Sequence, residues 1–337
     1  MTDSPAPDFQ VLGIGNAIVD VLSQSEDSLL TELDLTKGAM TLIDATRADA
    51  LYARMGPGVE CSGGSAANTI AGLASLGSKA AYVGKVASDQ LGQVFRHDVK
   101  ALGVHYDTKS DEKGAPTARC LIFVTPDAQR TMQTFLGACV DLGPEDIDPE
   151  LVGRSAVTYL EGYLWDPPRA KEAFVKAALS AHQAHRKVAL SLSDAFCVDR
   201  HRDSFIDLVK HHVDLLFANE DEIKSLFQVA TFDEAMHLVP DHVEIAAITR
   251  GERGSVVWGP GEGQGELHIM EAEPVDHVID TTGAGDAYAA GFLHGFTQGD
   301  DLARCARLGG ICSAEVISHY GARPESALKA LAAEKLG

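Results

Sequence analysis

The segment VIDTTGAGDAYAAGF (278–292) gathers residue types that can support chemistry directly before a run with the apolar spacing of a helix. Glycines at a helix start let backbone N–H groups approach a ligand closely, and the helix dipole adds positive potential there. A tip formed by Gly283, Ala284 and Gly285 suits the charge that develops on a phosphoryl group during transfer. Asp286, in the first turn, is placed to accept the proton of an attacking hydroxyl as a general base. The alternative is an acid that only complements the helix dipole, beside glycines that only turn the chain.

A second pair of polar side chains follows the first apolar run of the chain. The run FQVLGIG (9–15) has the composition of a buried strand, and Asn16 and Asp20 come directly after it, four residues apart. A carboxylate can accept two hydrogen bonds from a vicinal diol, as expected in a sugar-binding site.

The charge of the chain limits its partners. Its 337 residues carry 49 acidic and 28 basic side chains, which gives a net charge of −21. Such a surface repels nucleic acid and anionic lipid, so we expect neither a nucleic-acid nor a membrane partner. An anionic ligand would need a local device such as a helix N-terminus.

Other features of the composition favour a cytoplasmic protein. The six cysteines show no CxxC spacing, which suggests a reducing compartment and small buried side chains. No apolar stretch reaches the length of a membrane helix, and the start MTDSPAPDF lacks the pattern of a signal peptide.

Short apolar runs alternate with amphipathic stretches along most of the chain. Helices are expected at 65–77, after 79–86, after Pro168, and from a capping box at Thr231 and Glu234. Buried strands are expected at 9–15, 79–86, 156–162, 187–193, 213–218 and 243–249. This alternation predicts an α/β fold with a doubly wound, mostly parallel sheet flanked by helices.

Two segments break the alternation, residues 21–61 and 105–139. The second contains ARCLIFV and TMQTFL around the turn TPDAQ, the pattern of an antiparallel hairpin with one exposed face. We expect these segments to form a small β lid over a large domain made of 1–20, 62–104 and 140–337. A simple surface hairpin would have the same sequence pattern.

Three sequence patterns partly match other kinds of binding site, but each lacks a required feature. GIGNAI (13–18) has Ile18 where a dinucleotide fingerprint needs its third glycine, so no NAD site is predicted. GLASLGSK (72–79) has its lysine at a helix end, out of order for a phosphate loop. The pair His211 and His212 shows no metal-ligand spacing with cysteines or acids.

The segment DTTGAGD (280–286) resembles the C-terminal signature of the ribokinase-like (PfkB) family of carbohydrate and nucleoside kinases. GGSAANTIAGLASLG (63–77) resembles the N-terminal signature of the same family, so the resemblance extends over most of the chain. It implies the ribokinase-like fold with its lid, and sugar contacts from Gly63, Gly64 and Asn68. A strand-to-helix turn capped by Ser65 is the alternative reading of the second segment.

Further elements of the family are matched at the nucleotide end. LFANEDE resembles the family's Asn-x-x-Glu element, which implies that Asn219 and Glu222 organise Mg²⁺ through water, although Asn219 is also a natural N-cap. TRGERGS resembles a turn of the nucleotide site, which implies ATP contacts from Thr249, Gly251 and Gly254.

Two further roles follow from the resemblance. Many family members use potassium near this signature, which implies a monovalent cation held by Asp280 and Thr282. Related nucleoside kinases carry an arginine for the transferred phosphate on a lid strand, where this chain has Arg130, and an exposed hairpin arginine is the alternative.

The spacing of Asn16 and Asp20 is the form found in the family's adenosine kinases, so the resemblance favours a ribonucleoside with Asp20 on the ribose hydroxyls. Met40 would contact the base from the lid, and the aromatic platform falls within EGYLW, at Tyr163, Leu164 or Trp165. Eukaryotic adenosine kinases usually have Asn in place of Thr282, so this chain is closer to the general family form.

The implied activity is ATP- and Mg²⁺-dependent phosphorylation of the 5′-hydroxyl of adenosine, giving AMP and ADP. The alternatives are a family kinase for fructose, ribose, inosine or guanosine, a nucleoside-binding regulator without turnover, and a remote one, a dehydrogenase. A lid sheet can cap one site or pair with a second subunit, so both a monomer and a homodimer are compatible with the sequence.

Overall fold

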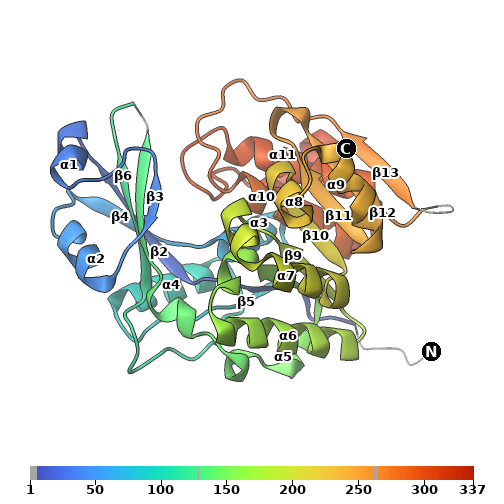
Figure 1. Ribbon diagram of the computed structural model, residues 1–337, viewed down its shortest axis with the longest axis horizontal. Helices are drawn as coiled ribbons and strands as arrows, with labels where there is room; N and C mark the ends of the chain where they lie inside the picture. The colour runs from blue at the N-terminus through green and yellow to red at the C-terminus, as the bar shows by residue number, and fades with distance from the viewer. Residues whose placement is uncertain (1–5, 128, 262–264) are drawn as a thin grey trace.

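The computed structural model describes residues 6–127, 129–261 and 265–337. Its main sheet has eight strands in the order β13-β12-β11-β10-β9-β8-β1-β5 (Figure 1). Six of them are parallel: β1 (Phe9–Ile14), β5 (Ala80–Val83), β8 (Ser155–Glu161), β9 (Lys187–Ser191), β10 (Leu215–Asn219) and β11 (Ile245–Thr249). The strands β12 (Ser255–Gly259) and β13 (Glu266–Met270) extend the sheet antiparallel.

Helices cover both faces of this sheet. The adjacent residues Val11 and Leu12 of β1 pack into different hydrophobic clusters, because successive side chains of a strand point to opposite faces. One face carries α5 (Pro149–Gly153), α6 (Pro168–Gln183), α7 (Ala195–His212), α8 (Glu220–Phe227) and α9 (Phe232–Leu238). The other carries α3 (Ser65–Leu76), α4 (Gln90–Ala101), α10 (Ala284–Gln298) and α11 (Leu302–Val316), with α12 (Leu328–Leu336) packed on α3 and α11.

Short 3₁₀ turns complete the connections: η1 (Gly137–Asp141), η2 (Pro144–Asp146), η3 (Gly162–Trp165), η4 (Val239–Asp241) and η5 (Gly251–Arg253). The expected doubly wound, mostly parallel sheet flanked by helices is confirmed. Among the described residues, no helix combines the length and apolar character needed to cross a membrane.

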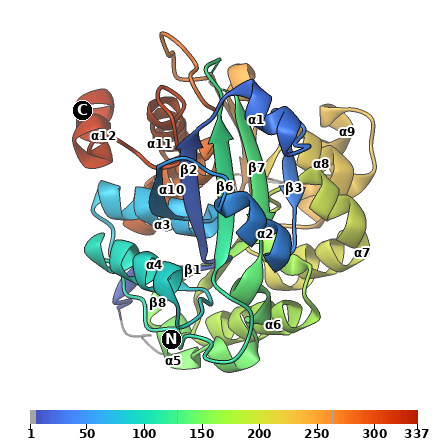
Figure 2. The same ribbon diagram turned by 90° about the vertical axis from the view of Figure 1, so that its left-hand side faces the viewer.

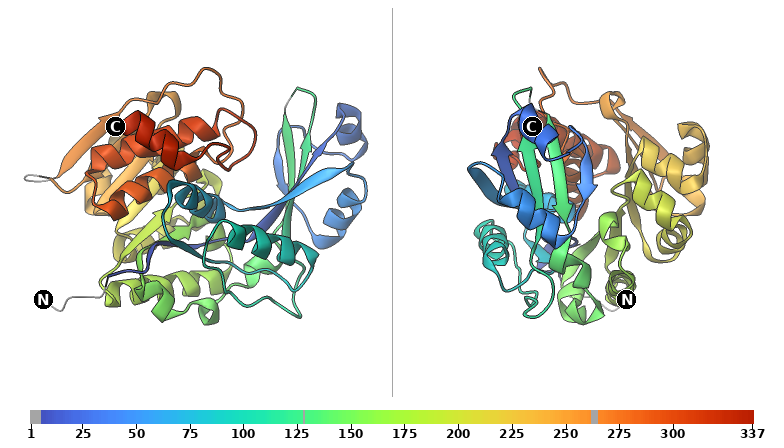
Figure 3. Two further views of the ribbon diagram at one scale, coloured as in Figure 1. Left: turned by 180° about the vertical axis from the view of Figure 1, so that it is seen from behind. Right: turned by 60° about the vertical axis from the view of Figure 1, so that its left-hand side comes forward.

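A second sheet of five strands stands at one end of the main sheet (Figures 2 and 3). It contains β3 (Met40–Leu42), β7 (Arg130–Phe135), β6 (Ala118–Val124), β2 (Ile18–Gln24) and β4 (Gly58–Gly63), in that order. The expected antiparallel hairpin is the β6–β7 pair. The division of the chain into a large domain and a lid at the stated boundaries stays a prediction.

One face of the second sheet is covered by α1 (Asp27–Glu32) and α2 (Ala45–Tyr52). Leu30 and Leu51 of this layer form a small buried cluster with Leu121 and Phe123 of β6. The opposite face carries Ile18, Asp20, Leu22, Ile122 and Met132, which line a cavity described below. The second sheet therefore has its own core on one side and a free face on the other.

Candidate active site

The cavity has a volume of about 2000 Å³ and lies between the free face of the second sheet and the carboxyl ends of the parallel strands. Ligand sites of open α/β sheets occur at this edge. Most of the predicted residues line it: Asn16, Asp20, Met40, Gly64, Asn68, Arg130, Asn219, Glu222, Thr249, Gly251, Gly254, Thr282, Gly283, Ala284, Gly285 and Asp286. Gly63 and Asp280 are not part of its wall.

The start of α10 forms the glycine-lined tip. Gly283 is the N-cap residue with φ +78°, and a Cβ there would lie 2.6 Å from Cβ of Ala322. The N–H of Ala284 donates to the carbonyl oxygen of Thr281 (3.2 Å). Within the described chain, the N–H groups of Gly283 and Gly285 have no internal acceptor. Two of the three predicted amides are thus free to bind an anion.

Asp286 lies in the first turn of α10 and faces the cavity. Its carboxylate accepts hydrogen bonds from Oγ of Ser65 (2.6 Å) and Nδ2 of Asn68 (3.2 Å), both on the first turn of α3. Burial raises the pKa of Asp286 to about 6, against the opposing effect of these two donors. A carboxyl group with this pKa is ionised at neutral pH and is a better base than an ordinary aspartate.

The start of α3 differs from the alternative reading in one respect. Gly64, with φ +98°, is the N-cap residue and makes no side-chain cap, and Ser65 is the first helical residue. The hydroxyl of Ser65 does not cap the helix because it donates to Asp286 instead. A Cβ on Gly64 would lie 2.1 Å from the carbonyl oxygen of Asn16, so only glycine fits there.

Glu161, at the end of β8, was not identified from the sequence. It is buried, and its carboxylate accepts from Nδ2 of Asn16 (2.7 Å) and from the backbone N–H of Ala66 (2.7 Å). Burial raises the pKa of Glu161 to about 7. Its proximity to Asn16 comes from strand order, because β8 is the neighbour of β1 and both strands end at the same edge. Glu161 leaves Oδ1 of Asn16 free to accept a hydrogen bond from a ligand.

Asp20 lies on β2, close to the glycine pair Gly63 and Gly64. Its carboxyl group packs against Gly63, where a Cβ would lie 2.4 Å from Oδ2 of Asp20. Burial raises the pKa of Asp20 to about 6, and the charges of Arg323 and Arg130 oppose this rise. Arg323 lies in the loop after α11 and carries no family signature, so sequence reasoning missed it.

At the part of the cavity predicted to bind the nucleotide, Asn219 caps α8 by accepting from the N–H groups of Asp221 and Glu222. The carboxylate of Glu222 accepts in return from N (2.9 Å) and Nδ2 (2.7 Å) of Asn219. Burial raises the pKa of Glu222 to about 7, and the nearby acids Asp194 and Asp286 contribute. The N-cap reading of Asn219 is therefore confirmed, and the predicted role of this pair toward Mg²⁺ remains open beside it.

Thr249 ends β11, and η5 carries the chain back into β12. Both Gly251 (φ +58°) and Gly254 (φ +76°) adopt the left-handed region in this turn. A Cβ on Gly254 would lie 2.0 Å from the carbonyl oxygen of Met270, whereas one on Gly251 would meet nothing. Both glycines line the cavity, as the resemblance implies for an ATP contact.

Arg130 and Asp280 are paired with each other. Nη1 of Arg130 lies 2.9 Å from Oδ2 of Asp280, and both side chains are about nine-tenths buried. Asp280 also accepts from N (3.0 Å) and Oγ1 (2.7 Å) of Thr282 and from N of Gly321 (3.0 Å). In this structure a guanidinium therefore balances the carboxylate expected to hold a monovalent cation. The phosphate role of Arg130 and the cation site stay predictions.

Of the three candidates in EGYLW, only Tyr163 faces the cavity. Tyr163 is 41% exposed and lines it together with Phe196, which is 75% exposed and follows β9. Leu164 and Trp165 are buried. Phe196 was missed because it lies in the first turn of α7, more than thirty residues from Tyr163 in sequence, and lines the same cavity only through the fold.

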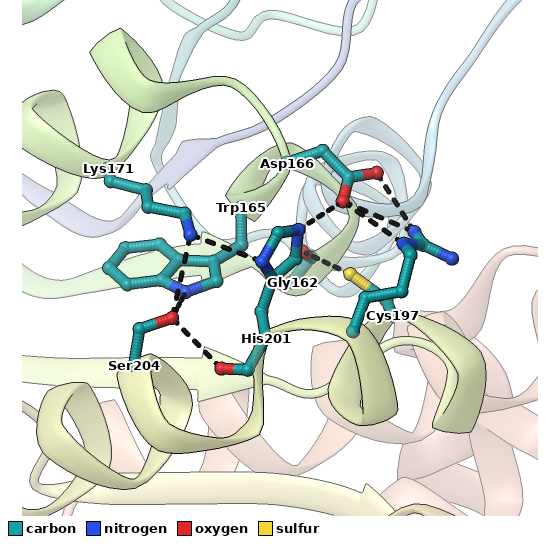
Figure 4. Close-up of polar contacts among 8 residues, drawn as sticks. Gly162, Trp165, Asp166, Lys171, Cys197, His201 and Ser204 are labelled. Atoms are coloured by element: carbon teal, nitrogen blue, oxygen red, sulfur yellow. Dashed lines mark hydrogen bonds and ion pairs between the residues drawn. The ribbon is translucent and has the colours of Figure 1, made fainter.

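Trp165 is not part of the cavity wall and instead contacts side chains of α6 and α7 (Figure 4). Its Nε1 donates to Oγ of Ser204 (2.9 Å), and Nζ of Lys171 lies 5.3 Å from the centre of its ring. Next to it, Asp166 pairs with Arg200 (2.9 Å) and His201 (2.5 Å) of α7. These contacts fix η3, and with it Tyr163, against the start of α7.

Among the described residues, no group of three or more His, Cys, Asp or Glu side chains is arranged to hold a metal ion. Glu222 and Asp194 nevertheless line the same cavity as the glycine-lined tip, and the charge of Asp194 helps to raise the pKa of Glu222. This arrangement fits a divalent cation that arrives with the phosphates of ATP and contacts the protein through water.

Comparison with known proteins shows the family to which the chain belongs. A family model described as pfkB family carbohydrate kinase matches residues 39–329. A probable sugar kinase from Rhizobium etli is 51% identical over 98% of this chain and 99% of its own, with a TM-score of 0.89. The adenosine kinase from Sinorhizobium meliloti is also 51% identical, over the same shares of both chains, with a TM-score of 0.88. The adenosine kinase from Dictyostelium discoideum is 23% identical over 93% of this chain and 96% of its own. The chain therefore belongs to the pfkB family of carbohydrate kinases.

Proposed function

We propose that this kinase phosphorylates the 5′-hydroxyl of adenosine with Mg·ATP, giving AMP and ADP. The observation that carries the proposal is the position of Asp286: a half-buried carboxylate near the free amides of Gly283 and Gly285, facing a cavity that Asp20 also lines. The 51% identity to the adenosine kinase from Sinorhizobium meliloti supports the choice of substrate.

The nucleoside reading is also supported by the apolar and aromatic side chains around the sugar end. Tyr163 and Phe196 offer exposed rings on the side of the main sheet, and Met40 offers a flexible apolar side chain from β3. Aromatic faces bind flat heterocycles well. A purine base would cover more of this surface than a free sugar, most of whose groups are hydroxyls.

Different residues would bind the sugar and accept the proton. Asp20, Asn16 and Asn68 would bind the sugar through its hydroxyl groups, and Gly64 would allow it to approach the backbone. Asp286 would accept the proton of the 5′-hydroxyl as the oxygen attacks the terminal phosphate of ATP in line.

The amides of Gly283 and Gly285 would bind the oxygens of the transferred phosphoryl group, where they stabilise its charge. The turn with Thr249, Gly251 and Gly254 would hold the nucleotide, and Glu222 would contact the water shell of Mg²⁺. When bound, Mg²⁺ neutralises charge on the phosphates of ATP. Movement of the second sheet toward the main sheet would exclude water from the phosphates.

A sugar kinase is the second candidate, because the equally similar protein from Rhizobium etli is described as a probable sugar kinase. An ADP-release assay with Mg·ATP separates the candidates, using adenosine, inosine, guanosine, ribose, fructose and ribose 1-phosphate as acceptors. We expect kcat/KM for adenosine to exceed that for each sugar by at least tenfold. A sugar as the best acceptor overturns the nucleoside assignment, and adenosine binding without ADP release indicates a regulator.

A further inference from the structure

Arg323 enters the site from the C-terminal part of the chain. The loop 317–327 lies between α11 and α12 on the side that faces the second sheet (Figures 1 and 3). Arg323 lines the cavity, and its Nε donates to Oδ1 of Asn68 (3.4 Å). Its Nη2 is buried and has no hydrogen-bond partner among the described residues. The guanidinium is therefore not neutralised by a hydrogen-bonded ion pair of its own.

Among the carboxylic acids, Asp20 interacts most strongly with the charge of Arg323, ahead of Asp98. Arg323 and Arg130 are the two cations that lower the pKa of Asp20, and Arg323 has the larger effect. Arg130 is engaged by Asp280, at 2.9 Å. Arg323 is thus the cation available to Asp20, and it partly offsets the cost of keeping a buried carboxylate charged.

Other titratable groups around this pair come from several elements. On β2, Asp20 is flanked by Cys61 of β4 and by Cys120 of β6, its partners across the sheet. Asp98 of α4 also acts on Arg323, and its Oδ2 accepts from N of Ser62 (2.9 Å). Burial raises the pKa of both cysteine thiols, so they remain neutral near pH 7. Asp20, Asp98 and the two arginines are left as the charges near the diol end.

Arg323 also defines the orientation of Asn68. A guanidinium has only donors, so its contact with Asn68 selects the amide oxygen. The amide nitrogen of Asn68 then points to Oδ2 of Asp286, to which it donates (3.2 Å). A chain of contacts therefore runs from the C-terminal loop through α3 to the proposed general base.

We propose that Arg323 is a positioning residue of the sugar-binding end: its N–H group orients the amide of Asn68, and its guanidinium supplies positive charge to the part of the cavity that Asp20 lines. The inference rests on the proposed function, because both effects serve a substrate that presents two neighbouring hydroxyl groups. An ionised Asp20 accepts two hydrogen bonds from such a diol, whereas a protonated one loses acceptor capacity.

The test compares three variants with the full-length protein. Arg323→Lys keeps the charge, Arg323→Gln removes it, and Arg304→Gln removes an exposed arginine of α11 that pairs with Asp300 (3.4 Å). Dissociation constants for adenosine and for 2′,3′-dideoxyadenosine are measured by calorimetry without ATP from pH 5.5 to 8.5. The second ligand has the base but not the diol.

At pH 7.5, we expect Arg323→Gln to weaken adenosine binding about tenfold or more, since the lost contact involves a charged group. Arg323→Lys should recover most of the affinity, and Arg304→Gln should match the unmodified protein. Binding of the dideoxynucleoside should change by less than about threefold in all variants. Without Arg323 the pKa of Asp20 rises, so the loss of adenosine affinity on acidification should begin at a higher pH in Arg323→Gln.

Two results overturn the inference: unchanged adenosine affinity and pH dependence in Arg323→Gln, or equal losses for both ligands, which indicate a general structural role. Failure of the unmodified protein to bind adenosine overturns the nucleoside proposal instead. The Arg323 variants are then compared with the best acceptor found in the ADP-release assay and with an analogue of that acceptor that lacks the diol.

The effect of Arg323 can also be measured without a ligand, through the reactivity of Cys61. This thiol can be followed separately because Cys61 is half-buried and the other five cysteines are buried. The charge of Arg323 lowers the pKa of Cys61. At a fixed pH of about 8.5, alkylation of Cys61 by iodoacetamide should therefore be slower in Arg323→Gln and stay near its original rate in Arg323→Lys. An unchanged rate in Arg323→Gln contradicts the proposed effect of the charge.

Discussion

At the scale of single residues, four carboxyl groups line the cavity: Glu161 and Glu222, which are buried, and Asp20 and Asp286, which are half-buried. Burial raises the pKa of each, because the charged form loses its hydration. Asp286 differs from the other three in its two side-chain donors and in its place beside free amides. Its hydrogen bonds hold it ionised near neutral pH while burial keeps it basic, which is the combination a general base requires.

Removing one of these donors should change the pH profile. Ser65→Ala deletes a hydrogen bond that lowers the pKa of Asp286, so the pKa should rise above its value of about 6. The acidic limb of kcat/KM reports the base in the free enzyme and should move to higher pH, with activity at pH 8 much less affected. The measurement is kcat/KM for adenosine from pH 5 to 9. A profile superimposable on that of the unmodified enzyme contradicts the assignment of the Ser65 contact.

At the scale of elements, the start of α10 depends on one glycine for its geometry. Gly283 adopts a positive φ, and a Cβ would clash with Ala322 at 2.6 Å. Gly285, two residues further, has open space around the position of a Cβ. The two glycines of the tip therefore have different roles: Gly283 shapes the turn, and Gly285 keeps the approach to the helix end clear.

This difference predicts opposite results for two matched variants. Gly283→Ala should lower the free energy of unfolding by about 1–3 kcal/mol, because it combines backbone strain with a clash. Gly285→Ala lies in a helix and should leave stability unchanged or slightly increased. Denaturant unfolding followed by circular dichroism measures both. Equal stability of the two variants would mean that the loop carrying Ala322 moves aside without cost.

The sequence allowed most elements to be predicted, for reasons visible in particular strands. Parallel strands that are buried on both faces have continuous apolar sequences. The strands β9, β10 and β11 were predicted from apolar runs of this kind. The hairpin of β12 and β13 was not singled out, because β13 is half-exposed and has a mixed composition. Motif residues were predicted to surround one site, and most line one cavity.

The site residues that sequence reasoning missed share one property. Glu161, Phe196 and Arg323 belong to no local motif and reach the cavity from three different elements. Their proximity depends on strand order and on the path of a loop, which are long-range features. Local spacing indicates which residues suit a reaction, whereas neighbours from other strands become visible only in the fold.

At the scale of the whole molecule, the acids with raised pKa values should make the unliganded protein less stable as the pH rises from acidic to neutral. A carboxyl group whose pKa is raised on folding binds its proton more tightly in the folded state. Its contribution to stability is full at low pH and is lost as pH rises through the folded pKa. For Glu161, raised from 4.5 to about 7, the window is pH 4.5 to 7.

The variant Glu161→Gln tests this linkage because it removes the titration. Between pH 5 and 8, the unmodified protein should lose more stability than the variant, by on the order of 3 kcal/mol for a shift of this size. Thermal unfolding across this range measures the difference. Glu172→Gln, at an exposed position of α6, is the matched control and should follow the unmodified protein. Parallel curves for all three proteins contradict the raised pKa of Glu161.

The central claim is that Asp286 removes a proton while the adjacent glycine amides stabilise the transferred phosphoryl group. It is tested most directly by Asp286→Asn, which keeps the shape of the side chain and its place in the cavity, with kcat from ADP release and the adenosine dissociation constant from calorimetry measured on the same preparation. We expect kcat to fall by about 10² to 10⁴-fold, while the dissociation constant changes by less than about threefold. A variant that retains most of its kcat, or that loses adenosine binding in proportion to its activity, contradicts the claim.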